Sequence, residues 1–495
     1  MKGINLIFWT GLLSAGLLLG ESCNRGTRTA VTVEDSVLQV ISTYLDWEGE
    51  NGFSGVVLVK IPGAPPLIRS YGFANSELEI PNGPDVVFNI GALTKQFTGA
   101  AILKLQMLGK LNVHDTLGVF FSDFPAGLRK ISLHRLLTHS SGLPVEIGSS
   151  TEVLTREELI NRLKQLPDRE YADSSYHYSH TGYNLLGLVI EKITGTDYES
   201  FVQQYLFKPA GMKRTGYRFP DWSNSVLAHG YSYCNDWGRP MDSGWLDDGP
   251  SWNRRASGGF LSTVNDLMAW HLALLGDQIL DEKSKKLYYY PEPSVSINPV
   301  SKSAYGWQVI KSSRNTDVIA HNGWNGRFYA DFLRYLKEDV TIILVSNRFR
   351  DGNQNMPYQL ARIVFKYPDP PKLMGRKTEC FDSLPSNRLG EISGELFSLL
   401  SHGSEKDIST FISKYVASHL TNKYGPDSLL ASFRKMQLET GTVRYKQVRV
   451  FDNRIMFLDV IKLLDNQEAS FMIFFDENED YRIRGISYKS PDERY

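Results

Sequence analysis

Cysteine is scarce in this chain of 495 residues, and neither acidic nor basic residues are in excess. Three cysteines are too few for a disulfide scaffold, and their spacing does not match a zinc site. Fifty-four Lys and Arg residues against 55 Asp and Glu residues leave a net charge of −1. This balance provides no general basic field, so we expect no nucleic-acid partner. No cluster of His, Cys or Asp has the spacing of metal ligands, so no metal or organic cofactor is expected.

The first residues carry the one long apolar run of the chain, residues 4–20, which follows Lys2. A charged start, an apolar middle and a small residue before the cut are typical of a signal peptide. Cys23 directly follows a small residue and resembles the lipidated cysteine of a bacterial lipobox. We therefore expect removal of residues 1–22, a tether over residues 23–35, and export to the periplasm or cell envelope with a lipid anchor in the membrane. A plain signal peptide or an uncleaved anchor is the alternative.

The rest of the chain has an ordinary globular composition, with 42% hydrophobic and 22% charged residues. Its length predicts two to four domains at roughly 100–200 residues each. Apolar periodicity and turn residues predict strands near both ends of residues 36–366, with helices between them. The expected elements include helices around 37–45, 94–108, 185–193 and 355–365, and strands at 53–60, 67–73, 329–335 and 340–346. This region reads as one α/β domain whose sheet is completed by the returning chain.

A different pattern follows residues 367–387, which contain four prolines and read as a linker. Helical stretches near 388–402 and 406–417 precede strand-like runs at 441–451, 454–460, 470–476 and 482–488. Helices followed by an antiparallel sheet predict a small α+β accessory domain over residues 388–495. It resembles, weakly, the NTF2-like or cystatin-like domains, which would offer a surface for a ligand or a protein partner.

Several sequence motifs lie between these elements. Residues 88–97 read FNIGALTKQF. This stretch is similar to F-x-I-G-S-x-T-K, the first motif of the serine β-lactamases and penicillin-binding enzymes, and is most like the class C β-lactamase, D-aminopeptidase and esterase branch. In that family a nucleophilic Ser begins a helix and a Lys follows one turn later. Residues three apart share a helix face, so the amine can reach the hydroxyl that it must deprotonate.

Further segments of the same family follow in the expected order. Residues 136–144 (LLTHSSGLP), 176–183 (YHYSHTGY), 209–212 (PAGM), 257–263 (SGGFLST) and 321–323 (HNG) resemble its remaining motifs. Residues 176–183 are similar to the segment that carries the second motif, Y-x-N, and residues 321–323 resemble the third, K-T-G or H-x-G. The resemblance implies a β-lactamase/transpeptidase-like fold over residues 36–366, with an antiparallel sheet flanked by helices plus a helical subdomain.

The resemblance also implies roles for individual residues. It makes a proton-transfer pair of Lys95 and Tyr178 and an oxyanion hole of two backbone N–H groups, which need no particular side chain. The positions implied are the nucleophile position Ala92, the catalytic residues Lys95 and Tyr178, and the substrate-binding residues His180, His321, Gly323 and Trp324. The oxyanion donors would be the N–H groups of Ala92 and Trp324. An alternative reading makes Lys95 and Tyr178 a structural polar network inherited from an active ancestor.

Two residues depart from the family pattern. Ala92 stands where the family has its serine, and a methyl side chain is no nucleophile. The chain contains one Ser-x-x-Lys sequence, at Ser432 and Lys435. It lies in the C-terminal region without the other motifs, and we attribute it to chance. His180 stands where the family has Asn, and an imidazole cannot reproduce the simultaneous donor and acceptor of an amide.

Losing the nucleophile of a comparable nucleophile–base system lowers the rate about 10⁶-fold, whereas most pocket contacts do not involve that hydroxyl. The sequence therefore predicts a pseudoenzyme that binds peptide or cell-wall-type ligands without forming a covalent bond. An active esterase, D-amino peptidase, carboxypeptidase or β-lactamase is the alternative, if Ala92 is an introduced residue or if Lys95 and Tyr178 activate water. A purely structural or interaction protein is a third reading. The sequence leaves open whether Cys234 and Cys380 form a disulfide.

Overall fold

The structure is a computed structural model, and it describes residues 33–149, 152–171, 175–232, 235–348, 350, 352–366, 378–451 and 454–489. Cys23 and the expected signal peptide lie outside the described residues. The first helix, α1 (Val33–Glu50), begins inside the stretch expected to be a tether. None of the described helices is long and apolar enough to cross a membrane.

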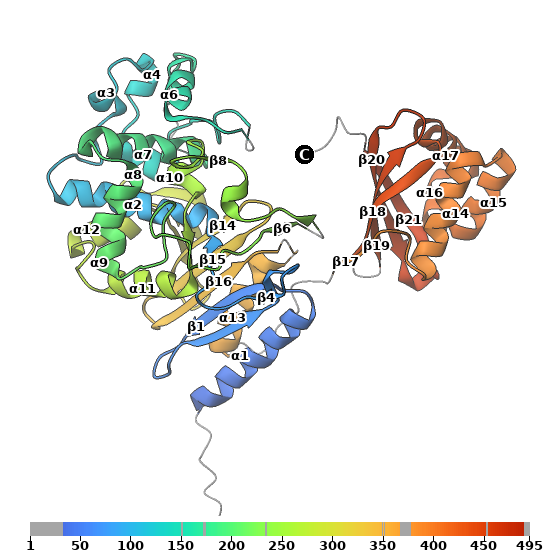
Figure 1. Cartoon of the computed structure of the whole chain (residues 1–495), viewed down its shortest axis with the longest axis horizontal. Coiled ribbons are helices and arrows are strands. Elements are labelled where there is room, and N and C mark those ends of the chain that lie inside the picture. The colour runs from blue at the N-terminus through green and yellow to red at the C-terminus, as the bar shows by residue number, and fades with distance from the viewer. Residues whose placement is uncertain are drawn as a thin grey trace, which may run out of the picture.

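An eight-stranded antiparallel sheet forms the centre of the first 366 residues (Figure 1). Its spatial order is β11, β12, β13, β14, β15, β16, β1, β2. The bounds are β1 Gly55–Lys60, β2 Leu67–Tyr71, β11 Val295–Asn298, β12 Ser301–Ser303, β13 Gln308–Lys311, β14 Asp317–Trp324, β15 Tyr329–Tyr335 and β16 Val340–Ser346. Strand β1 pairs with β16, with Val56 opposite Val345, so the returning chain completes the sheet as predicted.

Both faces of this sheet are buried, because side chains of successive residues point to opposite sides of a strand. On β1, Val57 and Val59 pack with α1 and α13 (Met356–Val364), whereas Val56 and Leu58 pack into the larger core on the other face. Val40 is apolar but does not belong to the buried face of α1, since it is 48% exposed. Glu48 takes part in the buried face of α1 instead, because it forms a buried ion pair with Arg350 (2.7 Å).

A mostly helical region packs against the second face of the sheet (Figure 1). Two of its helices were expected from the sequence, α2 (Thr94–Met107) and α7 (His180–Thr194), and both are largely buried. The others are α3 Leu117–Phe120, α4 Ala126–Arg129, α5 Leu133–Leu137, α6 Arg156–Lys164, α8 Tyr198–Val202, α9 Lys208–Ala210, α10 Arg255–Gly258, α11 Val264–Leu275 and α12 Glu282–Tyr289. Short strand pairs add β3 Phe73–Asn75 with β4 Ile80–Pro81, β5 Phe88–Asn89 with β10 Leu261–Ser262, β6 Tyr231–Ser232 with β7 Asn235–Asp236, and β8 Trp245–Leu246 with β9 Gly249–Pro250.

The C-terminal region has its own five-stranded antiparallel sheet and its own apolar core. Four helices precede four of the strands: α14 Arg388–His402, α15 Glu405–Tyr415, α16 Ser418–Tyr424 and α17 Pro426–Thr440, then β18 Val443–Phe451, β19 Ile455–Lys462, β20 Glu468–Asp476 and β21 Arg482–Lys489. The expectation of a linker up to residue 387 is wrong for β17 (Thr378–Phe381), which pairs with β18 at the sheet edge. Cys380 on β17 is disulfide-bonded, and both other cysteines lie outside the described residues.

Candidate active site

A short turn of helix presents Ala92 at the start of α2. Residues Gly91–Leu93 form a 3₁₀ turn that leads directly into α2. Asn89 Oδ1 accepts a hydrogen bond from Gly91 N (2.9 Å), and Thr94 Oγ1 donates one to Gly91 O (2.8 Å). Gly91 has φ of 51°, a left-handed conformation that glycine adopts without strain. These contacts fix the segment that we call the Ala92 turn, residues 89–94.

Strand β14 lies directly against the Ala92 turn at Gly323. A Cβ atom at Gly323 would overlap Ile90 O and would lie 2.6 Å from Ala92 N. A Cβ atom at Gly91 would lie 3.2 Å from Trp324 N. The predicted oxyanion donors, Ala92 N and Trp324 N, therefore belong to two backbone segments that only glycines allow to approach so closely.

Lys95 lies one turn after Ala92 and its side chain is fully buried. Its Nζ atom donates a hydrogen bond to Ser257 O (2.7 Å) and lies 3.0 Å from His180 Nδ1. It also lies 4.8 Å from the centre of the Tyr178 ring. Burial, reinforced by the nearby charge of Arg254, holds the pKa of the Lys95 amine well below its ordinary value.

A lowered pKa makes the neutral form of an amine easier to reach, and that form has a lone pair that can accept a proton. The Lys95 amine contacts Ser257 O and His180 Nδ1, and the other ring nitrogen of His180, Nε2, lies 4.0 Å from Glu146 Oε1. His180 thus contacts Lys95 from the position where the family resemblance implies an Asn. Burial and Lys95 also lower the pKa of His180, which keeps its ring neutral.

Tyr178 packs between two imidazoles. Its ring meets that of His180 edge to face at 5.1 Å, and it lies 4.5 Å from the ring of His139. Burial raises the pKa of the Tyr178 phenol above its ordinary value, so the group stays protonated at neutral pH. Tyr178 can therefore donate a proton or a hydrogen bond, and the lowered pKa of Lys95 makes its amine the more suitable group to exchange a proton at neutral pH. His139 is buried, and its Nδ1 accepts a hydrogen bond from Ser179 N (3.1 Å).

The third motif lies on β14 with alternating exposure. His321 is buried, and its Nδ1 lies 2.6 Å from Asn322 O, to which it donates. Burial and the proximity of Lys95 lower the pKa of His321 to about 3. The Trp324 side chain, in contrast, is 63% exposed. The structure thus assembles the predicted residues from three elements, α2, the start of α7 and β14, whereas Cys23 lies outside the described residues.

Comparisons with known proteins place this arrangement in a family. Residues 38–364 match the family model described as Beta-lactamase. The chain belongs to the β-lactamase family. Penicillin-binding protein 4* of Bacillus subtilis (strain 168) is 26% identical over 331 residues, which cover 63% of this chain and 72% of that protein.

Two solved structures show the same fold. A penicillin binding protein from Bacillus halodurans superposes with a TM-score of 0.55 at 23% identity, covering 67% of this chain and 98% of that one. The D-amino acid amidase from Ochrobactrum anthropi SV3, complexed with D-phenylalanine, gives a TM-score of 0.57 at 22% identity, covering 67% of this chain and 99% of that one. The predicted β-lactamase/transpeptidase-like fold is confirmed. The NTF2-like or cystatin-like likeness of the C-terminal region stays a prediction.

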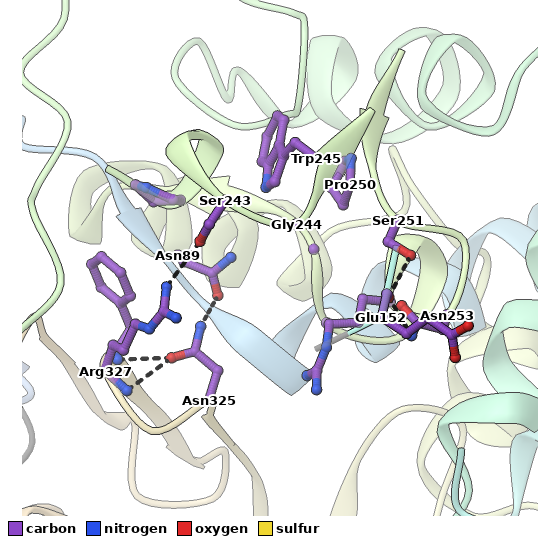
Figure 2. Close-up of a pocket in the computed structure, with 15 residues that line it drawn as sticks. Asn89, Glu152, Ser243, Gly244, Trp245, Pro250, Ser251, Asn253, Asn325 and Arg327 are labelled. Atoms are coloured by element: carbon purple, nitrogen blue, oxygen red, sulfur yellow. Dashed lines mark hydrogen bonds between the residues drawn. The ribbon is translucent and has the colours of Figure 1, made fainter. Parts of the chain in front are cut away.

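A cavity of about 260 Å³ lies beside the Ala92 turn of this β-lactamase-family chain (Figure 2). Its wall combines the turn, the segment before α10 and the β14–β15 connection, with mostly polar side chains. The lining residues are Asn89, Glu152, Pro240, Ser243, Gly244, Trp245, Pro250, Ser251, Asn253, Arg254, Gly258, Gly259, Asn325, Arg327 and Phe328. We call it the Arg254–Arg327 cavity.

The segment 223–255, rich in Trp, Tyr and Asp, supplies Trp245, Asn253 and Arg254 to this wall. Its Trp252 is buried in the core, and its Trp237 lies under the guanidinium of Arg327, 4.2 Å from the ring centre. Arg327 was missed, and its signal in the sequence is its place four residues after the third motif.

Metal-type donors come together elsewhere in the described residues. His419, Asp476 and Glu479 lie within 4.8 Å of one another in the C-terminal region, a grouping that their spacing in sequence does not reveal. His419 is exposed, and Glu479 already accepts hydrogen bonds from the backbone N and the hydroxyl of Ser418. Ser432 lies on α17, far in sequence from any other motif, and its hydroxyl donates to Ser428 O.

Proposed function

We propose that this protein binds peptide or cell-wall-type ligands in the cleft at the Ala92 turn without covalent chemistry. The observation that carries the proposal is Ala92 itself, next to an otherwise assembled site. Its methyl group stands one helical turn from the Lys95 amine, at the position where the family resemblance implies a serine hydroxyl. The relatives support the ligand class, since one is named a penicillin-binding protein and another is an amidase complexed with D-phenylalanine.

The chemistry of the site supports binding over turnover. No acyl bond can form at a methyl group, and loss of a comparable nucleophile lowers the rate about 10⁶-fold. The backbone of β14, the Ala92 turn and the Arg254–Arg327 cavity do not depend on the missing hydroxyl. A ligand can therefore keep its hydrogen bonds to the backbone and its contacts in the cavity. The protein acts in this proposal as a pseudoenzyme.

The proposal places the protein outside the cytoplasm. The apolar run at residues 4–20 and Cys23 support export to the periplasm or cell envelope, with a lipid on Cys23 as the membrane anchor. Metabolic labelling with a fatty-acid analogue should mark the natural protein and should fail to mark a Cys23→Ala variant. Labelling that persists in the variant contradicts the anchor and leaves the ligand-binding proposal intact.

An active hydrolase is the second candidate, and the lowered pKa of the Lys95 amine favours it. A neutral Lys95 amine could take a proton from a water molecule beside the methyl group of Ala92. A serine in place of Ala92 in the natural gene would restore the ordinary family mechanism. In either case the protein would turn over an ester or a D-amino peptide.

A paired assay separates the two candidates. The natural protein and its Ala92→Ser variant are incubated with a fluorescent penicillin, to detect covalent labelling, and with a p-nitrophenyl ester, to detect turnover. We expect labelling of the serine variant alone. Ser432→Ala in that variant is the matched control, because it removes the other Ser-x-x-Lys and should leave labelling unchanged. Turnover by the natural protein at rates normal for enzymes overturns the proposal.

A further inference from the structure

Two guanidinium groups line the Arg254–Arg327 cavity, and they differ in their partners. Arg254 forms an ion pair with Glu146 (3.4 Å). Arg327 makes a hydrogen bond to the hydroxyl of Ser243 (3.1 Å) and lies over the ring of Trp237. Among the described residues, no carboxylate pairs with Arg327. Its charge is therefore held by neutral groups at the wall of a cavity (Figure 2).

The two arginines also act on each other. Burial lowers the pKa of Arg327 below its ordinary value, and the neighbouring charge of Arg254 lowers it further. An arginine stays charged in proteins, so the lowered pKa of Arg327 means that its positive charge and that of Arg254 repel each other. An anion between or beside them would relieve that repulsion. A carboxylate fits the planar fork of a guanidinium through two parallel hydrogen bonds.

The acidic residue of the wall does not supply this anion. Glu152 is the carboxylate among the residues that line the cavity, and Arg162 engages it at 2.8 Å and 2.5 Å. The remaining polar wall is made of amides and hydroxyls. One of these, the buried Asn253, uses its Nδ2 on Ser149 O and Glu152 O, while its Oδ1 has no hydrogen-bond partner. A buried acceptor without a partner is uncommon, and a ligand N–H group would satisfy it.

A hydrogen bond joins the cavity to the Ala92 turn. Asn325 Nδ2 donates to Asn89 Oδ1 (3.2 Å), the same oxygen that accepts from Gly91 N. Asn325 in turn accepts from the backbone N–H groups of Arg327 and Phe328 through its Oδ1, which fixes the connection after β14. A ligand that lies along β14 would thus run from the Ala92 turn into the cavity.

We propose that the Arg254–Arg327 cavity binds a carboxylate carried by the part of the ligand that extends past the end of β14. The proposal rests on the proposed function, and it adds the ligand's chemical class: a peptide-type molecule with an acidic group beyond the part that faces Ala92. Arg327 is the main contact, and Arg254 adds charge. The volume of about 260 Å³ suits an end group or side chain rather than a whole drug-sized ligand.

A calorimetric titration of the full chain tests this with benzylpenicillin and carbenicillin, which differ by one carboxylate on the acyl side chain. We expect carbenicillin to bind about tenfold more tightly, as one charge-assisted hydrogen bond provides. In Arg327→Gln, which keeps a donor for Ser243 but no charge, the affinity ratio should fall towards one. Arg239→Gln is the matched control, because Arg239 is exposed and already paired with Asp242. Circular dichroism confirms that each variant is folded.

The possible outcomes distinguish a failure of the carboxylate site from a failure of the proposed function. Equal binding of the two penicillins by the natural protein, or a ratio that Arg327→Gln leaves unchanged, overturns the carboxylate site and leaves the proposed function standing. Failure of both penicillins to bind overturns the proposed function together with this inference. A third outcome is that inorganic phosphate binds and needs Arg327 to do so, while carbenicillin binds no more tightly than benzylpenicillin. This outcome overturns the assignment of the site to a carboxylate.

Discussion

Two sets of basic side chains lie near the Ala92 turn, and they differ in how they carry charge. Lys95, His180 and His321 are surrounded by protein, and burial lowers the pKa of each, which disfavours their charged forms. Arg254 and Arg327 are only partly buried at the wall of a cavity, and a guanidinium keeps its charge there.

The difference separates proton transfer from binding. A neutral amine serves a reaction that moves a proton, whereas a fixed charge serves recognition of an anion. In the proposed function, the methyl group of Ala92 stops the first role and leaves the second intact. The following predictions test this separation, from the largest expected effect to the smallest.

The largest effect concerns Lys95 in the Ala92→Ser background. Replacement of Lys95 by Met removes the proton acceptor, and in a comparable nucleophile–base system loss of the base lowers the rate about 10⁶-fold. Labelling by a fluorescent penicillin should therefore fall by several powers of ten. In the natural Ala92 background, where no acyl bond can form, Lys95→Met should change the calorimetric affinity for carbenicillin little. Lys104→Met is the matched control, because Lys104 lies on the same helix and donates to Ile279 O. Equal losses in the two variants would contradict a proton-transfer role for Lys95.

The next effect concerns the close approach of β14 to the Ala92 turn. In Gly323→Ala the added Cβ would meet backbone atoms of Ile90 and Ala92, which cannot move as a side chain can. We expect a loss of about 2 kcal/mol in the free energy of unfolding, as is typical of overpacking. Penicillin affinity should fall as well, because the backbone that would bind the ligand is displaced. Urea unfolding measures the first quantity and calorimetry the second.

Gly276→Ala provides the comparison for that substitution. A Cβ at Gly276 meets nothing within 4 Å, and its φ of −92° suits any residue. Its stability and penicillin affinity should stay close to those of the natural protein. If Gly323→Ala also left stability and penicillin affinity unchanged, the close packing of β14 against the Ala92 turn would not be needed for the structure of the cleft.

The smallest effect concerns the pH dependence of stability. Below pH 6.5 an unfolded chain protonates His321, whereas the folded chain does not until about pH 3. The unfolded state therefore binds more protons in this window, and the free energy of unfolding decreases as the pH falls. His321 should contribute about 1 kcal/mol of loss between pH 6.5 and 5.5. The slope measured by urea unfolding should be shallower in His321→Gln than in the natural protein. Equal slopes in the two proteins would contradict the buried neutral state of His321.

The sequence allowed a good prediction of the elements that have strong local signals. Strands β15 and β16 were expected with the bounds that they have, because two continuous apolar runs flank a charged turn at residues 337–339. Strand β17 was missed, since its four residues become a strand only by pairing with β18. The helix around residues 37–45 was expected, but its apolar residues alone do not reveal its buried face, since Val40 is exposed and Glu48 is buried.

The residues of the candidate site also fall into a part that the sequence predicted and a part that it did not. Motif order indicated Lys95, Tyr178, His180 and the third motif, because these residues lie in segments with a recognisable pattern. The cavity could not be predicted, since Arg254 and Arg327 lie 73 residues apart and meet only through the packing of the β14–β15 connection. The lowered pKa of Lys95 also depends on its burial, which no local pattern reveals.

The central claim is that the natural protein binds its ligands and leaves them chemically unchanged. Intact-mass spectrometry, combined with calorimetry on the same sample, measures this most directly with benzylpenicillin as the ligand. The account predicts saturable binding, no adduct on the protein, and intact benzylpenicillin recovered after long incubation. A penicilloyl adduct on the natural chain, or hydrolysed penicillin formed at a rate normal for an enzyme, would contradict it.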